Sequence, residues 1–188
     1  MVTPEDKVFL EIKKKFKKKV NKRRTKLRLA EAYAFVESGV IPKQQPYMNA
    51  QVLRELQYFL ERMNMELKPA LFLSYDRVAM FGKDNKDFRI TFDRNITTRR
   101  YDLGLHYGVY GEQLLSEDEW IMEVKIEEAM PLWMTKILSE FKLYPVSFSK
   151  YGTEYTRYML GWDESGDEET ALTDEACCSS AFRIRNLI

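Results

Sequence analysis

Apolar and polar residues alternate over several short stretches of the chain, which is typical of β-strands that bury one face. Residues 120–127 show this most clearly, because Trp120, Met122 and Val124 share one side. Glu123 and Lys125 share the other side. Turn-forming residues, such as the Gly-Lys-Asp-Asn segment at 82–85, separate the stretches. The pattern predicts strands over residues 8–13, 69–81, 88–93, 97–103 and 120–127.

Four other segments carry apolar residues at the three-to-four-residue spacing of an amphipathic helix. Gly39 ends the first, Pro131 suits the first turn of the third, and Ser149 is a predicted N-cap for the fourth. The predicted helices span residues 27–38, 47–65, 131–142 and 150–162. Strands with short turns and helices grouped on either side indicate an α+β fold around a mainly antiparallel sheet.

The distribution of charge divides the chain near residue 162. From Asp163 onward seven acidic residues stand against two arginines and the periodicity is lost, so we expect a disordered acidic tail over residues 163–188. Residues 1–162 carry the compensating charge of about +6 and hold every predicted element. Within residues 13–28, eleven of sixteen are lysine or arginine. Such a run forms either a solvated surface or an attraction for an anionic partner.

Several classes of site are disfavoured by what the chain contains. The adjacent Cys177 and Cys178 are unsuited to bridging each other, and with His106 as the only histidine no Cys/His zinc cluster is expected. This cysteine usage favours a reducing, cytoplasmic location. No apolar run approaches the roughly 20 residues that cross a bilayer. His106 itself, in a loop beside Tyr107, is expected to be incidental.

The polar faces of the predicted strands carry an unusual share of cations. Residues i and i+2 of a strand point the same way, about 6.5–7 Å apart, so alternate charged residues become neighbours on one face. Surface strands more often place Thr, Ser or Gln at such positions. The charged residues on these faces are Glu11, Lys13, Arg77, Arg89, Asp93, Glu123 and Lys125.

Two interpretations of these charged faces compete. One is an ordinary antiparallel sheet with a solvated side, in which Arg89 or Lys125 forms structural ion pairs with Asp93 or Glu123. The other is a sheet curled around a cationic interior that holds a polyanion and a divalent metal. Duplex nucleic acid needs a groove-reading element, and single strands need exposed aromatics, whereas the strand aromatics fall on the core face. A chain of linked phosphates fits the second interpretation best.

Seven short motifs support that choice by their order and spacing. They are Phe-Leu-Glu-Ile-Lys at 9–13, Asn-Lys-Arg-Arg at 21–24, Tyr-Asp-Arg at 75–77, Phe-Arg-Ile-Thr-Phe-Asp at 88–93, Met-Glu-Val-Lys at 122–125, Met-Pro-Leu-Trp at 130–133 and Ser-Phe-Ser-Lys-Tyr at 147–151. Each is weak alone. Together, over roughly residues 5–160, they resemble the VTC domains, the polyphosphate-polymerase family within the triphosphate-tunnel (CYTH-like) group.

The resemblance implies a fold and an activity. The antiparallel sheet would form part of a triphosphate-tunnel barrel flanked by helices. The reaction would be metal-dependent transfer of the ATP γ-phosphoryl group to inorganic polyphosphate, without a specific nucleic-acid partner. Glu123 would bind Mn²⁺ or Mg²⁺, while Arg77, Arg89 and Lys125 would act in catalysis. The implied phosphate ligands are Lys13, Lys22, Arg77, Arg89, Arg100 (with Arg99 as the alternate), Lys125, Ser149 and Lys150.

One departure from the family pattern concerns the start of the chain. The strands that family members carry upstream are not found before Val8, so we expect an N-terminally incomplete VTC-like tunnel domain over residues 1–162. Its open sheet edge would offer pairing with another chain. Two further functions stay open. A tunnel triphosphatase would use water as the phosphoryl acceptor, and a non-catalytic module would bind polyphosphate or another polyanion without turnover.

Overall fold

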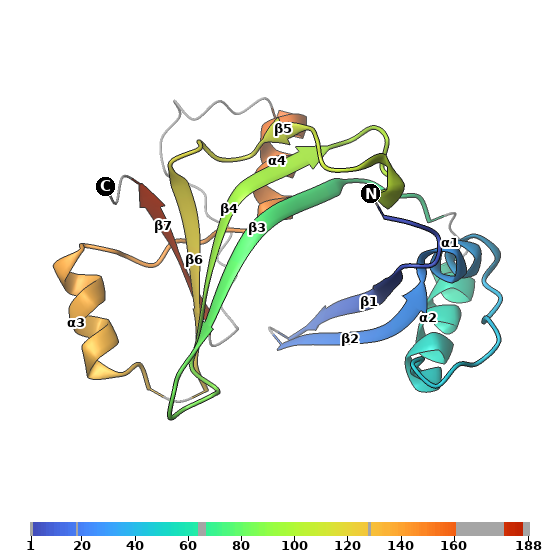
Figure 1. Ribbon diagram of the computed structural model, residues 1–188, viewed down its shortest axis with the longest axis horizontal. Coiled ribbons are helices and arrows are strands. Elements are labelled where there is room, and N and C mark those ends of the chain that lie inside the picture. The colour runs from blue at the N-terminus through green and yellow to red at the C-terminus, as the bar shows by residue number, and fades with distance from the viewer. Residues whose placement is uncertain (1, 18, 64–66, 128, 161–178, 186–188) are drawn as a thin grey trace. The chain divides into compact units, whose positions relative to one another are not determined.

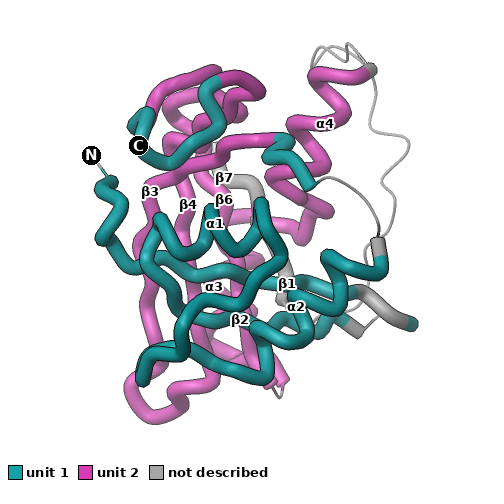
Figure 2. Tube along the Cα trace, turned by 90° about the vertical axis from the view of Figure 1, so that its right-hand side faces the viewer, with its two compact units in different colours: residues 1–70, 102–108 teal, residues 71–101, 109–188 magenta. Residues whose placement is uncertain are grey.

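The computed structural model describes residues 2–17, 19–63, 67–127, 129–160 and 179–185, whose elements are labelled in Figure 1. The chain divides into two compact units, shown in different colours in Figure 2. The first comprises residues 1–70 and 102–108, and the second comprises residues 71–101 and 109–188. Antiparallel strands and helices occur in both, which confirms the predicted α+β class.

The first unit is a β-hairpin whose apolar face packs against helices. Its elements are β1 (Lys7–Phe16), β2 (Lys19–Arg28), α1 (Leu29–Ser38), α2 (Ala50–Met63) and the 3-10 turn η1 (Leu105–Tyr107). The two strands pair antiparallel along their whole length. Ile12, Leu27, Phe35, Val52 and Leu53 are buried in one cluster, with Val8 and Leu10 packed against it. The alternation of residues 8–13 is therefore confirmed.

The junction between β2 and α1 lies two residues later than predicted. Leu27 belongs to β2 because the hairpin pairing continues until Arg28 lies opposite Lys7. The helix begins at Leu29, where the Glu31 carboxylate accepts a hydrogen bond from the Arg28 backbone N–H at 2.8 Å, as in a capping box. Gly39 ends α1 as predicted, in the left-handed region with φ of 70°.

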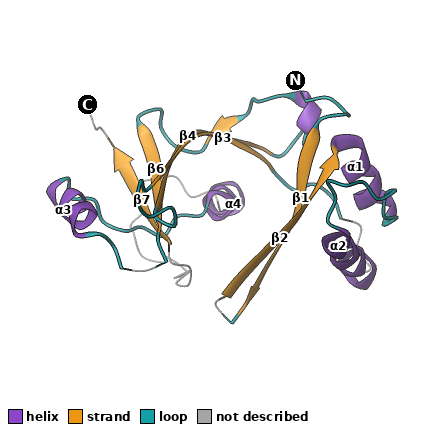
Figure 3. Cartoon of the chain, turned by 60° about the horizontal axis from the view of Figure 1, so that its bottom comes forward, coloured by secondary structure: helices purple, strands orange, loops and turns teal. Residues whose placement is uncertain are grey.

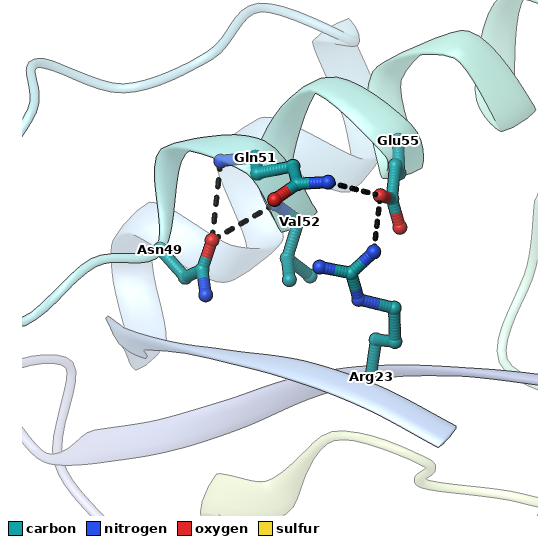
Figure 4. A network of polar contacts seen from close by, with 5 residues as sticks. All are labelled: Arg23, Asn49, Gln51, Val52 and Glu55. Carbon is teal, nitrogen blue, oxygen red and sulfur yellow. Dashed lines mark hydrogen bonds and ion pairs between the residues drawn. The ribbon is translucent and has the colours of Figure 1, made fainter. Parts of the chain in front are cut away.

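Side chains cap the start of α2 and connect its N-terminal half to β2 (Figure 4). The Asn49 Oδ1 accepts hydrogen bonds from the backbone N–H groups of Gln51 and Val52, each at 3.1 Å, and so caps the helix. Glu55, one turn further along, accepts hydrogen bonds from the side chains of Arg23 and Gln51. Arg23, although part of the basic run, therefore has a structural role, because it connects the hairpin to α2.

The second unit is a five-stranded antiparallel sheet with a helix on each side (Figure 3). Its strands are β3 (Phe72–Phe81), β4 (Arg89–Arg99), β5 (Glu112–Gln113), β6 (Glu119–Lys125) and β7 (Ser179–Arg185), in the order β3-β4-β6-β7 with β5 on β4. Helix α3 (Leu132–Glu140) covers the apolar face, where Met134 packs on Phe88, Met122 and Val124. Helix α4 (Lys150–Leu160) meets the opposite face through Lys150.

The two strands predicted on either side of residue 95 are one continuous strand, β4. Its register with β3 shifts between Ser74 and Asp76, and Asn95 adopts a positive φ of 51°, so the strand continues through a β-bulge. The Asn95 amide donates a hydrogen bond to Asp76 at 2.7 Å, which holds the bulge. Beyond it Ile96 is fully buried with Leu114. The bulge therefore changes which residues of β4 face the core.

Strand β7 lies inside the segment for which the sequence predicts a disordered tail, and that prediction is wrong for residues 179–185. β7 pairs with β6 from Glu119 opposite Arg185 to Lys125 opposite Ser179. Phe182 is buried in the cluster that includes Met122, so an apolar residue anchors the strand. Residues 161–178 and 186–188 lie outside the described residues, and with them the predicted boundary at 162 and both cysteines.

The strands that the structure describes form two open sheets, so the predicted barrel is not closed among them. β3 is an edge of the larger sheet and pairs on one side with β4. In the described part of the chain, no helix combines the length and the hydrophobicity needed to cross a bilayer. The antiparallel, helix-flanked architecture is confirmed, and the tunnel stays a prediction.

Candidate functional site

One side of the larger sheet, which we call the polar face, is built from three rows of side chains across β3, β4 and β6. The strand register alone creates the rows, because residues that are directly opposite each other point to the same side. Neighbouring rows are about 6.5–7 Å apart. The rows are Arg77 with Asp93 and the apolar Ile121; Ala79 with Thr91 and Glu123; and Phe81 with Arg89 and Lys125. The shared side predicted for Arg77, Arg89, Glu123 and Lys125 is therefore confirmed.

Asp93 is the most buried charge of the polar face, with 1% of its side chain exposed. Arg77 donates a fork of two hydrogen bonds to it, Nε to Oδ1 at 2.6 Å and Nη2 to Oδ2 at 2.7 Å. Lys150, the first residue of α4, places its Nζ 2.6 Å from the same Oδ2. Both cations also lie over the ring of Tyr75, at 4.8 Å and 4.7 Å from its centroid. One carboxylate thus joins β3, β4 and α4.

This environment changes the pKa values of the buried pair. Burial raises the pKa of Asp93, but the hydrogen bonds and charges of Arg77 and Lys150 outweigh it, so the pKa lies below its ordinary value. The hydrogen bond to Asp93 raises the pKa of Arg77. Asp93 is therefore ionised at neutral pH. Because one carboxylate faces two cations, this cluster keeps a net positive charge that attracts anions.

The other end of the polar face holds a weaker ion pair, which joins the middle row to the end row, and a more available cation. Lys125 Nζ lies 3.0 Å from Glu123 Oε1, and both side chains are partly exposed. This confirms the structural pairing that the sequence leaves open for Lys125 and Glu123. Asp93, by contrast, pairs with Arg77 and Lys150 and not with Arg89. Among the described residues Arg89 has no ion-pair partner, so its guanidinium is available to a ligand.

The hydroxyl of Thr91, opposite Glu123 in the middle row, suggests how a ligand would fit. Thr91 is 3% exposed, and its Oγ1 has no hydrogen-bond partner among the described residues. Leaving such a group unsatisfied costs about 1–3 kcal/mol, which a ligand oxygen would recover. Glu123 beside it fits a divalent ion that takes one protein carboxylate and completes its shell with phosphate oxygens and water. Within the described residues, no three or more Asp, Glu, His or Cys side chains are arranged so that they could hold a metal ion by themselves.

The start of α4 confirms the role predicted for Ser149 as an N-cap. Its Oγ accepts a hydrogen bond from the Gly152 backbone N–H at 3.2 Å, and its carbonyl accepts one from Thr153 at 2.7 Å. The cap fixes the first turn and hence the direction of Lys150 toward Asp93. The Ser149 cap, a feature of the local sequence, therefore orients the Lys150 side chain toward the sheet.

Arg99, the last residue of β4, and Arg100, which follows it, make contacts that stabilise the fold. Arg100 donates Nε and Nη2 to the two carboxylate oxygens of Glu154 at 2.7 Å and 2.8 Å, and this raises the pKa of Arg100. Glu154 is a buried residue of α4, so the fork fastens the helix to the strand. Arg99 is buried with its guanidinium over the rings of Phe72 and Tyr110. These contacts give Arg99 and Arg100 a structural role. A phosphate contact by either arginine stays a prediction.

In the first unit, Lys13 and Lys22 lie directly opposite each other on β1 and β2. They occupy the hairpin face away from the apolar cluster, with Arg24 further along it over the ring of Phe9 at 4.4 Å. Lys22 forms an ion pair with Glu11 at 2.8 Å. This unit therefore carries a cationic surface of its own, and it brings the two predicted lysines together there.

Comparison with protein families decides what kind of domain this is. A family model described as "VTC domain" matches residues 1–159. The chain belongs to the VTC domain family. No curated protein and no solved structure matches it. The family that the seven motifs resemble is thereby confirmed, and VTC domains are associated with polyphosphate synthesis and tunnel-like phosphate binding.

Two features of the polar face of this VTC domain were not predicted from the sequence. The alternation of residues 88–93 places Asp93 on the polar face, but its partner Lys150 belongs to a distant helix, and no local signal joins them. Thr91 shares that face, yet only the three-dimensional structure shows that its hydroxyl is buried without a partner. Both features depend on how α4 and the sheet pack.

Proposed function

We propose that this VTC domain is a metal-dependent polyphosphate polymerase that transfers the γ-phosphoryl group of ATP to an inorganic polyphosphate chain. The main support is that cations predicted from the motifs gather on one polar face, beside a single carboxylate that fits a metal. Four cations are involved there, namely Arg77, Arg89, Lys125 and Lys150. Such a surface suits a linear ligand that carries negative charges at regular intervals.

Phosphoryl transfer asks the protein for positioning and charge, not for a side-chain nucleophile. A terminal oxygen of the acceptor chain attacks the γ-phosphorus, the bond from this phosphorus to the bridging oxygen breaks, and ADP leaves. Arg77 and Arg89 would offer planar N–H donors to the phosphoryl oxygens, and Lys125 would add a point charge. The strand register fixes these groups in advance, so little reorganisation accompanies the reaction.

Mg²⁺ or Mn²⁺, when bound, supplies additional neutralisation of phosphate charge. Glu123 would hold it, and the Thr91 hydroxyl, opposite Glu123 in the register, would donate to a phosphate oxygen. Lys125 would then turn from Glu123 toward the phosphates. This exchange is inexpensive, because partly exposed ion pairs contribute only about 0–1 kcal/mol.

Lys150 and Ser149 would bind the phosphate at the other end of the polar face. Lys150 reaches it from the first turn of α4, where the helix dipole favours an anion. Its contact with Asp93 keeps the ammonium group in place before a ligand arrives. Ser149 shapes this turn through its cap.

The deciding experiment separates three functions by their products. The full chain is incubated with ATP, a polyphosphate primer and Mn²⁺ or Mg²⁺, and the products are resolved on a gel. Longer chains support the polymerase. Free orthophosphate alone would instead indicate a tunnel triphosphatase, in which water is the acceptor.

Polyphosphate binding without turnover would indicate the non-catalytic module. One observation favours this non-catalytic module as a second candidate function. Asp93 already holds Arg77 and Lys150, so a phosphate chain has to compete with a buried internal anion for both. A surface of that kind is suited to binding that is reversible and sensitive to salt.

A further inference from the structure

A pocket of about 320 Å³ lies at the end of the polar face, beside the turn that joins β3 to β4. Its size is near the lower limit of the roughly 300–1,000 Å³ range of small-molecule sites. Arg89 and Lys125 line it, so it opens directly onto the proposed phosphate site. The other lining residues that matter here are Phe81, Lys86, Asp87 and Glu127.

The Phe81 ring is the unusual member of this pocket. It is 62% exposed, although it stands in the row that also contains Arg89 and Lys125. Among the described residues it has neither an aromatic partner nor a cation over its ring. An exposed aromatic ring beside cations is the arrangement with which proteins stack nucleobases while binding the adjoining phosphates.

We propose that this pocket receives the base of a nucleoside triphosphate, with the base stacked on Phe81 and the phosphates directed along the polar face. The inference rests on the proposed function and adds the binding site for the non-reacting part of the donor. The row of Phe81 is two rows from that of Arg77, which is about 13–14 Å along the strands. An extended nucleoside triphosphate spans a comparable length, so the γ-phosphoryl group would approach the row of Arg77 and Asp93.

The charges of the pocket favour a base over a further phosphate. Asp87 and Glu127 place two carboxylates among the three cations of the lining, so the pocket attracts a phosphate group less strongly than the cations of the polar face do. Carboxylates also accept hydrogen bonds from the amino groups of bases. Phosphates would thus stay beside Arg89 and Lys125, while the base occupies the side of Phe81.

The test compares two ligands that differ in the base. Binding of ATP and of inorganic tripolyphosphate to the full chain is measured by titration calorimetry at one fixed Mg²⁺ concentration. The variants are Phe81→Leu, which removes the ring, and Phe81→Tyr, which keeps it. Phe141→Leu is the matched control, because Phe141 is a similarly exposed ring (55%) that does not line the pocket.

We expect Phe81→Leu to weaken ATP binding on the order of tenfold and to leave tripolyphosphate binding unchanged. Phe81→Tyr and the control should bind both ligands as the parent does. An equal loss for both ligands, or no loss for ATP, would overturn the base site without contradicting the proposed function. If the parent chain binds neither ligand, the proposed function fails together with the inference.

Discussion

Replacing Asp93 with asparagine removes one negative charge from the polar face and keeps the shape of the side chain. Three charged hydrogen bonds end on this carboxylate, two from Arg77 and one from Lys150, at 2.6–2.7 Å. In the variant both cations lose their counter-charge, and an amide oxygen remains as the one acceptor. The substitution therefore tests whether Asp93 organises this part of the site.

The size of the effect follows from burial. Removing one partner of a buried ion pair costs about 3–5 kcal/mol, because an uncompensated charge is left behind. Here Arg77 is 34% exposed and Lys150 20% exposed, so each can turn partly toward water. We therefore expect a loss near the lower limit, about 3 kcal/mol. For a chain of this length that corresponds to a melting temperature lower by roughly 6–12 °C.

Urea unfolding followed by circular dichroism measures the loss, with an unchanged slope showing that the unfolded state is the same. Glu123→Gln is the control, because it removes a carboxylate from a more exposed pair and should cost less than about 1 kcal/mol. Added tripolyphosphate should stabilise Asp93→Asn more than the parent chain, since the variant leaves two cations for it. A loss below about 1 kcal/mol, or equal stabilisation of both proteins by the anion, would refute the organising role.

Three further predictions concern the same face. Glu123→Gln should abolish metal-dependent chain elongation and preserve the circular dichroism spectrum; normal turnover in the gel assay would remove the metal role of Glu123. Lys125→Ala should weaken polyphosphate binding and reduce the slope of log affinity against log salt by about one, which titrations at several salt concentrations measure; an unchanged slope would contradict a phosphate contact. Because folding lowers the pKa of Asp93, its contribution is present above the unfolded value of about 3.9 and is lost as pH falls through the folded value. The parent chain should therefore lose more stability than Asp93→Asn in denaturation curves between pH 5 and acid conditions, and parallel curves would count against the low pKa.

The parts of the site that the sequence predicts are those set by local periodicity. A strand repeats every two residues, so Glu123 and Lys125 had to share a side, whatever the rest of the chain does. The same reasoning placed Arg89 correctly. Ser149 was recognisable as a cap because its hydroxyl bonds within three residues of itself. These features require no knowledge of what lies across the sheet.

The parts that the sequence does not predict depend on contacts between distant segments. Strand β7 is stabilised by pairing with β6 and by burial of Phe182, and the short alternation of Phe182 and Ile184 with two arginines predicts neither contact by itself. The ion pairs of Asp93 and Arg100 with α4 likewise join segments that are far apart in the chain. The bulge at Asn95 did have a local signal, since asparagine tolerates a positive φ. The sequence pattern did not reveal the bulge, because residues typical of strands continue on both sides of Asn95.

These ion pairs also explain how a surface rich in cations is stable without a bound anion. Asp93 balances part of the charge of Arg77 and Lys150, and Glu123 balances Lys125. Ligand binding is then an exchange of partners, and its cost differs between the two kinds of cation. The forked contact of Arg77 is rigid and uses both carboxylate oxygens, whereas each lysine makes a single contact that a rotation of its flexible side chain can release. Phosphates should therefore draw the lysines away from their carboxylates, while Arg77 keeps its fork on Asp93 and offers its remaining N–H groups to the phosphates. Asp93 then keeps its structural role in the bound state as well.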